Sequence, residues 1–331
     1  MFHLLLGQDT RNWRRLGQGV WEHGLTKADG FVCRAERDML KGDRYSKYGL
    51  FFVLPSVAYF GLVFFYPLAL AFWNAFHNVN ILHGTSEWVG VGKFVKVVSH
   101  SGFQASVAVT FAYVLMVVPA LLVFSLALAA IVVSLREKFF SDAATTVFFL
   151  PVITSLVSAG IIWQWIFDPT LGVVNNVLGA LGVRHSLSWL QSPTMALPTV
   201  AVIGFWARLG FDLVIFVTAM NSIPDSYYEA AEIDGASEVQ QFFRITLPLL
   251  NPQIFMVSTI EFIFAFKAFD QIFVTTRGGP SGATKTVMVF LLKDVFNNDY
   301  GAACAITVLL LCFLFTISFA QWRFFNARSK H

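Results

Sequence analysis

Six long hydrophobic stretches constrain this sequence more than any other feature. Each is about as long as the roughly 20 residues that an α-helix needs to cross the hydrocarbon core of a bilayer. With 56% hydrophobic and only 13% charged residues, the chain is also too apolar for an ordinary soluble domain. We therefore predict an all-α integral membrane protein with six transmembrane helices. These lie near residues 50–76, 107–135, 145–167, 198–220, 252–274 and 302–322.

The basic residues between the stretches predict the orientation of the chain. If the N-terminus lies in the cytoplasm, the inside segments hold fifteen Arg and Lys residues, nine of them before Tyr48, and the outside segments hold six. Cytoplasmic segments of membrane proteins carry the excess of positive charge. We therefore expect a multi-pass protein with a cytoplasmic N-terminus, and the same orientation places the polar segment 221–250 in the cytoplasm.

Residues 1–47 form a polar, basic segment that we separate from a transmembrane domain at 48–331. Trp13, Leu16 and Val20 recur at helical spacing beside arginines. This pattern fits a helix lying in the membrane interface. A partly disordered cytoplasmic tail explains the composition equally well.

The segment Asn221–Leu250 is the only long polar stretch between two hydrophobic spans in the C-terminal half, and it predicts two helices joined by a turn. Pro224 suits the first turn of a helix. Gly235 stops that helix, because glycine reaches the left-handed conformation of helix ends at little cost. Ser237, with a glutamine three residues later, forms a capping box for a second helix, which we expect to loosen before Pro248. An ordinary cytoplasmic loop with two short helices would show the same periodicity.

The residue identities within this segment resemble the EAA signature of the membrane-spanning subunits of ABC importers. The matching residues are Glu229, Ala230, Ala231, Asp234, Gly235, Ala236, Ile245, Leu247 and Pro248. In that family the first helix is the coupling helix, which sits in a cleft on the surface of the ATPase subunit. The resemblance therefore implies a type I ABC importer permease fold and assigns these residues to ATPase coupling.

The predicted outside segments carry further motifs. Residues 88–94 resemble a short VGL-x-NF element, residues 163–176 resemble a W-x-W-x-F-x-P…G…N pattern, and residues 276–284 are close to a T-x-GGP…T loop. These motifs are similar to those of carbohydrate-importer permeases of the maltose and glycerol-3-phosphate type. The long basic tail is also similar to that of the larger permease subunit of an alginate-oligosaccharide importer.

The resemblance implies partners outside this chain. These are a second, similar permease subunit, two ATPase subunits that bind ATP and Mg, and an extracytoplasmic solute-binding protein, assembled in the lipid of the bacterial inner membrane. The implied substrate is a carbohydrate, such as a neutral or uronate oligosaccharide, or a polyol phosphate. The chain itself would not be an enzyme, because hydrolysis would belong to the ATPase.

Charged residues inside the spans are candidates for a transport path. Each costs about 2.5 to 3.5 kcal/mol at the centre of a helix on insertion scales, so such residues normally face the bundle interior or a watery cavity. Arg208 and Asp212 are four residues apart and share a helix face. We favour a structural ion pair between them over substrate contact, and we expect Glu261 to meet Arg208 or another helix.

The predicted fifth span carries a polar stripe. Glu261, Phe264, Lys267 and Gln271 recur at steps of three and four residues and so lie on one face of a continuous helix. We predict that this stripe, with Arg208, lines a path for a sugar. Helix packing is the alternative for the aromatic member, because the chain contains 36 phenylalanines.

Other classes of function find little support in the sequence. Residues Gly279–Thr286 resemble a phosphate-binding loop, but Thr284 replaces its second glycine. The basic residues form no aromatic-interleaved patch, so we expect no nucleic-acid partner, and we predict no catalytic residue, metal site or cofactor within this chain. An ion-gradient-driven secondary transporter of a small polar solute is the main alternative. It would be expected to show inverted repeats, and none is evident.

Overall fold

A computed structural model describes residues 45–80, 85–135, 137–182, 187–296 and 298–328. The chain divides into two compact units between Ala69 and Leu70, and each is considered by itself. The predicted tail, apart from its last three residues, lies outside the described residues, as does its predicted interfacial helix.

The first span is one continuous helical segment. Helix α2 (Tyr45–Phe60) passes through a π-helical turn (Gly61–Phe65) into α3 (Tyr66–Ala75). The part Phe51–Ala75 is long and apolar enough to cross a membrane, and none of its most apolar portion is buried. In water these exposed side chains would form an unusually large apolar surface. The segment therefore requires a lipid or protein environment that covers these side chains.

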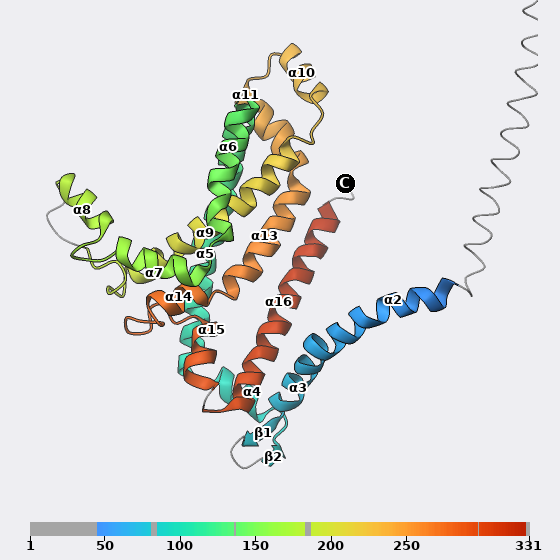
Figure 1. Cartoon of the computed structure of the whole chain (residues 1–331), viewed down its shortest axis with the longest axis vertical. Helices are drawn as coiled ribbons and strands as arrows, with labels where there is room; N and C mark the ends of the chain where they lie inside the picture. The colour runs from blue at the N-terminus through green and yellow to red at the C-terminus, as the bar shows by residue number, and fades with distance from the viewer. Residues whose placement is uncertain (1–44, 81–84, 136, 183–186, 297, 329–331) are drawn as a thin grey trace, which may run out of the picture. The chain divides into compact units, whose positions relative to one another are not determined.

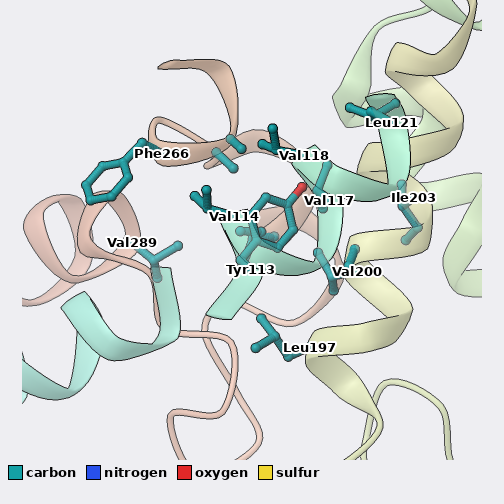
Figure 2. Close-up of a cluster of buried hydrophobic side chains, with 14 of the residues drawn as sticks. Tyr113, Val114, Val117, Val118, Leu121, Leu197, Val200, Ile203, Phe266 and Val289 are labelled. Carbon is teal, nitrogen blue, oxygen red and sulfur yellow. The ribbon is translucent and has the colours of Figure 1, made fainter. Parts of the chain in front are cut away.

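Helices α5 (Ser101–Ser134) and α9 (Ala196–Met220) pack along each other at the centre of the second unit. Their facing side chains form an apolar core that includes Tyr113, Leu121 and Ile203, as Figure 2 shows. At 34 residues α5 is about 51 Å long. This exceeds the roughly 30 Å of the hydrocarbon core, so α5 extends beyond it.

The predicted third span, 145–167, is not a straight helix. It consists of α6 (Lys138–Phe149), a 3₁₀ turn (Leu150–Ile153) and α7 (Leu156–Ile166), and its two halves meet at 100°. Pro151 lies in the turn, where it lacks the N–H that a continuing α-helix needs. The predicted third span therefore occurs as a bent pair of helices, and apolar composition alone did not report the break.

The predicted fifth span, 252–274, is also interrupted. Helix α13 (Asn251–Phe266) ends three residues before α14 (Asp270–Thr275) begins. The predicted stripe therefore does not lie on one continuous helix, because Glu261 and Phe264 are in α13, Lys267 follows it, and Gln271 is in α14. The last span is α16 (Tyr300–Arg328), which packs against α13. Among the described residues, four helices are long and apolar enough to cross a membrane. The number of spans rises to as many as six if each of two bent pairs, 138–153 with 156–166 and 238–249 with 251–275, counts as one span.

Helices α7 and α14, one from each of the two broken spans, hold each other in place. The side-chain amide of Gln164 in α7 donates to the carbonyl oxygens of Val274 (3.0 Å) and Thr275 (2.9 Å) at the end of α14. Helix α9 supports the bend of the third span closely, since a Cβ on Gly210 would come within 2.0 Å of the carbonyl oxygen of Phe148. Other parts of the protein thus contact this irregular backbone, whose N–H and C=O groups would find no hydrogen-bond partner in lipid.

A hairpin and the short helix α4 lie at the end of the second unit opposite to α10 (Ser226–Ile233) and α11 (Glu238–Gln241) (Figure 1). Strand β1 (His77–Asn80) pairs antiparallel with β2 (Thr85–Trp88). The short helices of the connecting segments are α4 (Gly92–Val98), α8 (Val173–Ala180) and α15 (Val287–Phe290), the last followed by a π-helical turn (Leu291–Val295).

An ion pair joins the hairpin, α4 and the start of α16. Lys93 Nζ donates to both carboxylate oxygens of Asp299 and to Asn78 Oδ1, each at 2.8 Å. Burial by itself would raise the pKa of Asp299, but hydrogen bonds from Lys93 and from the N–H of Ala302 outweigh it, and the pKa is lowered. The ionised carboxylate therefore contributes to holding these elements together.

Candidate coupling segment and intramembrane cavity

Helix α10 (Ser226–Ile233) is the predicted first helix of the polar segment, and it lies at one end of the second unit (Figure 1). The chain turns at Gly235, whose φ of +77° is left-handed. The N–H of Ala236 donates to the carbonyl of Ala231 at 2.9 Å, and the N–H of Gly235 donates to that of Glu232 at 3.0 Å. These two bonds form a Schellman motif. The predicted glycine stop is confirmed.

The second helix starts where the sequence predicts. It consists of α11 (Glu238–Gln241), a π-helical turn (Phe242–Thr246) and α12 (Leu247–Leu249). Ser237 and Gln240 form both hydrogen bonds of the predicted capping box. The predicted loosening before Pro248 is confirmed, because the α-helix widens into the π-helical turn Phe242–Thr246 just ahead of this proline. The chain then turns by 68° between α12 and α13.

Helix α10 has no buried residue. Glu229 is exposed, and so is Ile233, at 87%. Its link to the second helix is a hydrogen bond between Tyr228 Oη and the buried Thr246 Oγ1, at 2.8 Å. A short helix that buries nothing against its own chain and presents both a carboxylate and an isoleucine to the outside has the character of a docking surface.

A groove of about 540 Å³ lies between this segment and the C-terminal end of α5. Ile131 and Ala130 of α5 line one side, and Val239 and Phe243 line the other. Val239 and Phe243 are exposed. The second helix is therefore loosely packed on this side, which leaves room for it to move relative to α5.

A second cavity, of about 240 Å³, lies deeper, among α5, α7, α9, α13 and α14. Its lining includes all five residues predicted for the path: Arg208, Glu261, Phe264, Lys267 and Gln271. They meet there although the fifth span is interrupted, because the break before α14 lets both halves border the same space. That these residues contact a substrate stays a prediction.

Arg208 is held on several sides. Its Nε lies 3.1 Å from each carboxylate oxygen of Glu261, and its Nη2 also donates to Glu261. The guanidinium carbon lies 4.1 Å from the ring centroid of Phe264 and 4.6 Å from that of Phe211. Glu261 is 1% exposed. This is an ion pair across two helices with aromatic rings against its cation.

Asp212 does not form the ion pair that its spacing from Arg208 suggested. It is fully buried, and neither of its carboxylate oxygens has a hydrogen-bond partner among the described residues. The guanidinium is directed instead across to Glu261 on α13, where it gains two aromatic contacts as well. The favoured reading of a pair within α9 was therefore wrong, and the open alternative of a pair between helices is what the structure contains.

Two residues that the sequence did not single out, Tyr113 and Gly204, complete the wall of the cavity. Gln271 Nε2 donates to Tyr113 Oη at 2.9 Å, and both side chains are buried. A Cβ on Gly204 would lie 2.2 Å from that hydroxyl oxygen. A tyrosine and a glycine within long apolar helices gave no signal of this contact, which joins positions far apart in the chain.

The loop after α7 is ordered by Asp168. Its Oδ1 accepts hydrogen bonds from the backbone N–H of Leu171 and Thr170, both at 2.8 Å, and from the hydroxyl of Thr170. These bonds lower the pKa of Asp168, the bond from Leu171 most of all. A Cβ on Gly172 would lie 2.3 Å from the carbonyl oxygen of Asp168. The D-P…G elements of the outside motif thus build a tight turn.

Known proteins are similar to this chain in sequence and in fold. Residues 88–322 match the family model described as binding-protein-dependent transport system inner membrane component. The sn-glycerol-3-phosphate transport system permease protein UgpA of Yersinia pestis is 30% identical over 281 residues, which cover 84% of this chain and 94% of that protein. The probable ABC transporter permease protein YesP of Bacillus subtilis is 32% identical over 276 residues, covering 81% and 88%.

Among solved structures, a chain from a bacterial ABC transporter involved in the import of the acidic polysaccharide alginate superposes with a TM-score of 0.77. The match covers 87% of this chain and 99% of that chain, at 22% identity. At this identity the likeness concerns the fold. It confirms the predicted all-α permease architecture.

Proposed function

This chain belongs to the family of inner-membrane components of binding-protein-dependent transport systems, and we propose that it is one of two membrane subunits of an ATP-driven importer of a carbohydrate or polyol phosphate. The observation that carries the proposal is α10, an exposed helix with a Schellman stop, bonded through Tyr228 to the segment that enters the broken fifth span. The transport systems to which the similar permeases belong agree with it.

In this proposal α10 docks in a cleft of an ATPase subunit, which binds ATP and Mg and carries out hydrolysis. Glu229 meets a basic or hydrogen-bonding group there. Movement of α10 is transmitted through the Tyr228–Thr246 bond to α11 and α12, and across the 68° turn to α13. The far part of α13 carries Glu261, so the movement reaches the Arg208 pair. The groove beside α11 supplies the space that this movement requires.

The substrate path lies at the deeper cavity, with a second, similar permease subunit supplying the other half. The binding protein docks on the segments opposite to α10. The N-terminus and residues 1–47 lie in the cytoplasm. ATP-driven closure of the ATPase pair swings the spans from inward-facing to outward-facing, and the docked binding protein then releases its substrate into the cavity. The placement of the two docking sites is supported by the positions of α10 and the hairpin at opposite ends of the second unit (Figure 1).

The test is the ATPase activity and substrate uptake of the assembled complex in lipid, with and without loaded binding protein. We expect loaded binding protein to stimulate hydrolysis and to drive uptake. Glu229→Lys should uncouple hydrolysis from uptake while membrane insertion is kept, and Glu232→Lys on the same exposed helix is the matched control. Uptake that follows a proton or sodium gradient, with no co-purifying ATPase, would contradict the proposal and favour a secondary transporter.

A further inference from the structure

The deeper cavity carries charges of both signs, and their balance bears on the substrate. We infer that this cavity receives an uncharged sugar unit and not a uronate or a phosphate. The inference rests on the proposed function, because it names the substrate class of the same path. It narrows the range of carbohydrates and polyol phosphates that the family would allow.

The positive charge of Arg208 is already neutralised. Glu261 accepts hydrogen bonds from Nε and Nη2 of the guanidinium. Phe264 and Phe211 lie against the guanidinium. An incoming carboxylate or phosphate is best bound by the paired N–H groups of an arginine, and here a buried carboxylate of the same chain occupies them.

The remaining cation of the cavity lining is also balanced. Lys267 is exposed in the cavity, and Asp270, three residues later, lines the same space and is exposed as well. The lining therefore contains two cations and two carboxylates. Asp212, buried one turn from Arg208 on α9, adds no positive charge.

An anionic substrate would lose its hydration on entering such a cavity without meeting a net positive potential. Removal of an ion from water is costly unless a partner of opposite charge compensates it. Like charges juxtaposed across an interface select against a partner. Because its two cations are balanced by two carboxylates, the lining gives a uronate no net attraction to offset its dehydration, while the neutral hydroxyls of a sugar meet no such penalty.

The rest of the lining suits a sugar ring. Phe264 is 55% exposed and offers apolar contact, while Lys267 and Asp270 offer a donor and an acceptor for hydroxyl groups. Ligand sites commonly combine apolar and aromatic walls with a few polar groups. At about 240 Å³ the cavity is of a size for part of an oligosaccharide, with the rest of the path in the second subunit.

The first test measures the potential of the cavity directly. In the assembled importer in lipid, with Cys33, Cys304 and Cys312 replaced by serine, Leu156→Cys and separately Phe264→Cys place a thiol in the lining. The thiol is reacted with an anionic and with a cationic methanethiosulfonate, and the rate ratio is normalised to 2-mercaptoethanol. We expect the anionic reagent to be no faster than the cationic one.

Charge variants calibrate this ratio. Asp270→Asn removes an exposed carboxylate without disturbing the Arg208 pair. It should raise the anionic-to-cationic ratio by about tenfold, because one charge at about 6 Å in water changes the rate of each reagent by about threefold, in opposite directions. Lys267→Gln should lower it by a similar factor. An anionic reagent that is already about tenfold faster before any charge is changed would overturn the inference.

The second test asks which ligand occupies the cavity. Maltotriose, a trisaccharide of galacturonate and glycerol 3-phosphate are compared for protection of Leu156→Cys against an uncharged methanethiosulfonate in the same complex. Protection by maltotriose at the lowest concentration supports the inference. Stronger protection by the uronate or the phosphate overturns it and leaves the proposed importer intact. Protection by none of the three overturns it as well, and the stimulation of ATPase by loaded binding protein then decides separately whether the importer proposal stands.

Discussion

The coupling segment and the intramembrane cavity are built by different kinds of contact. Backbone bonds between near neighbours in sequence shape α10 and its glycine turn, and the segment is exposed. The cavity depends on side chains from helices far apart in the chain, such as Arg208 with Glu261 and Tyr113 with Gln271. A local change should therefore alter the first region without affecting assembly, whereas a change in the second should affect stability and the path together.

The largest effect should come from breaking the ion pair. Glu261→Ala leaves Arg208 among aromatic rings without its carboxylate, and we expect a loss of about 3 kcal/mol, the low end of the range for a buried pair because Arg208 is 20% exposed. The thermal midpoint of the detergent-solubilised complex measures it. Arg208→Met with Glu261→Leu should recover most of the loss, and an unchanged midpoint in the single variant would show that the pair is not a structural tie.

A smaller effect should follow from filling the space beside Tyr113. Gly204→Ala places a methyl group where only 2.2 Å separates it from the tyrosine hydroxyl, which should cost about 1 to 3 kcal/mol through overpacking. Adding Tyr113→Phe should relieve part of that cost. Gly179→Ala in α8, where nothing lies within 4 Å, is the control, and an equal loss there would contradict the close contact.

The coupling segment should respond differently. Gly235→Ala must adopt a φ of +77°, at a cost of about 1 to 2 kcal/mol for an L-residue. Because that strain is local, we expect normal amounts of complex in the membrane but fewer molecules transported per ATP hydrolysed. Gly235→Asn, which tolerates the left-handed region, should be milder. If both variants transport normally, the turn is not part of the coupling.

The smallest effect concerns the ion pair between Lys93 and Asp299. The pKa of Asp299 is lowered from its ordinary value of 3.8, so its stabilising contribution is present above that value and is lost as the pH falls through the lowered pKa. The protection of residues 92–98 against hydrogen exchange, relative to the intrinsic rate at each pH, should therefore fall as the pH decreases below 3.8. Lys93→Met should weaken this pH dependence, and an unaltered profile in that variant would contradict the assignment.

Sequence patterns predicted the coupling segment well, because its signals are local. Gly235 and the Ser237 capping box act within one turn of the chain, and both occur as expected. The six spans also followed from hydropathy. The breaks in the third and fifth spans did not, since hydropathy treats a bent segment and a straight one alike, and residues 267–269 contain no glycine or proline.

The partner of Arg208 needed the three-dimensional fold. Sequence spacing offered Asp212 at one turn, whereas Glu261 is 53 residues away and faces Arg208 only because α9 and α13 pack together. The contact of Tyr113 with Gln271 spans 158 residues. The five predicted path residues all line the cavity. Of the bonds in its wall, the pair of Arg208 with Glu261 was anticipated as one alternative, and the contact of Tyr113 with Gln271 was not.

The close approach of α9 to its neighbours has a consequence for how the sequence can change over evolution. A Cβ on Gly204 would lie 2.2 Å from the hydroxyl oxygen of Tyr113, and one on Gly210 would lie 2.0 Å from the carbonyl oxygen of Phe148. A larger side chain at either position requires a compensating change in its neighbour. Drift should therefore be slow at these two glycines and faster at Gly179, where a Cβ would meet nothing within 4 Å.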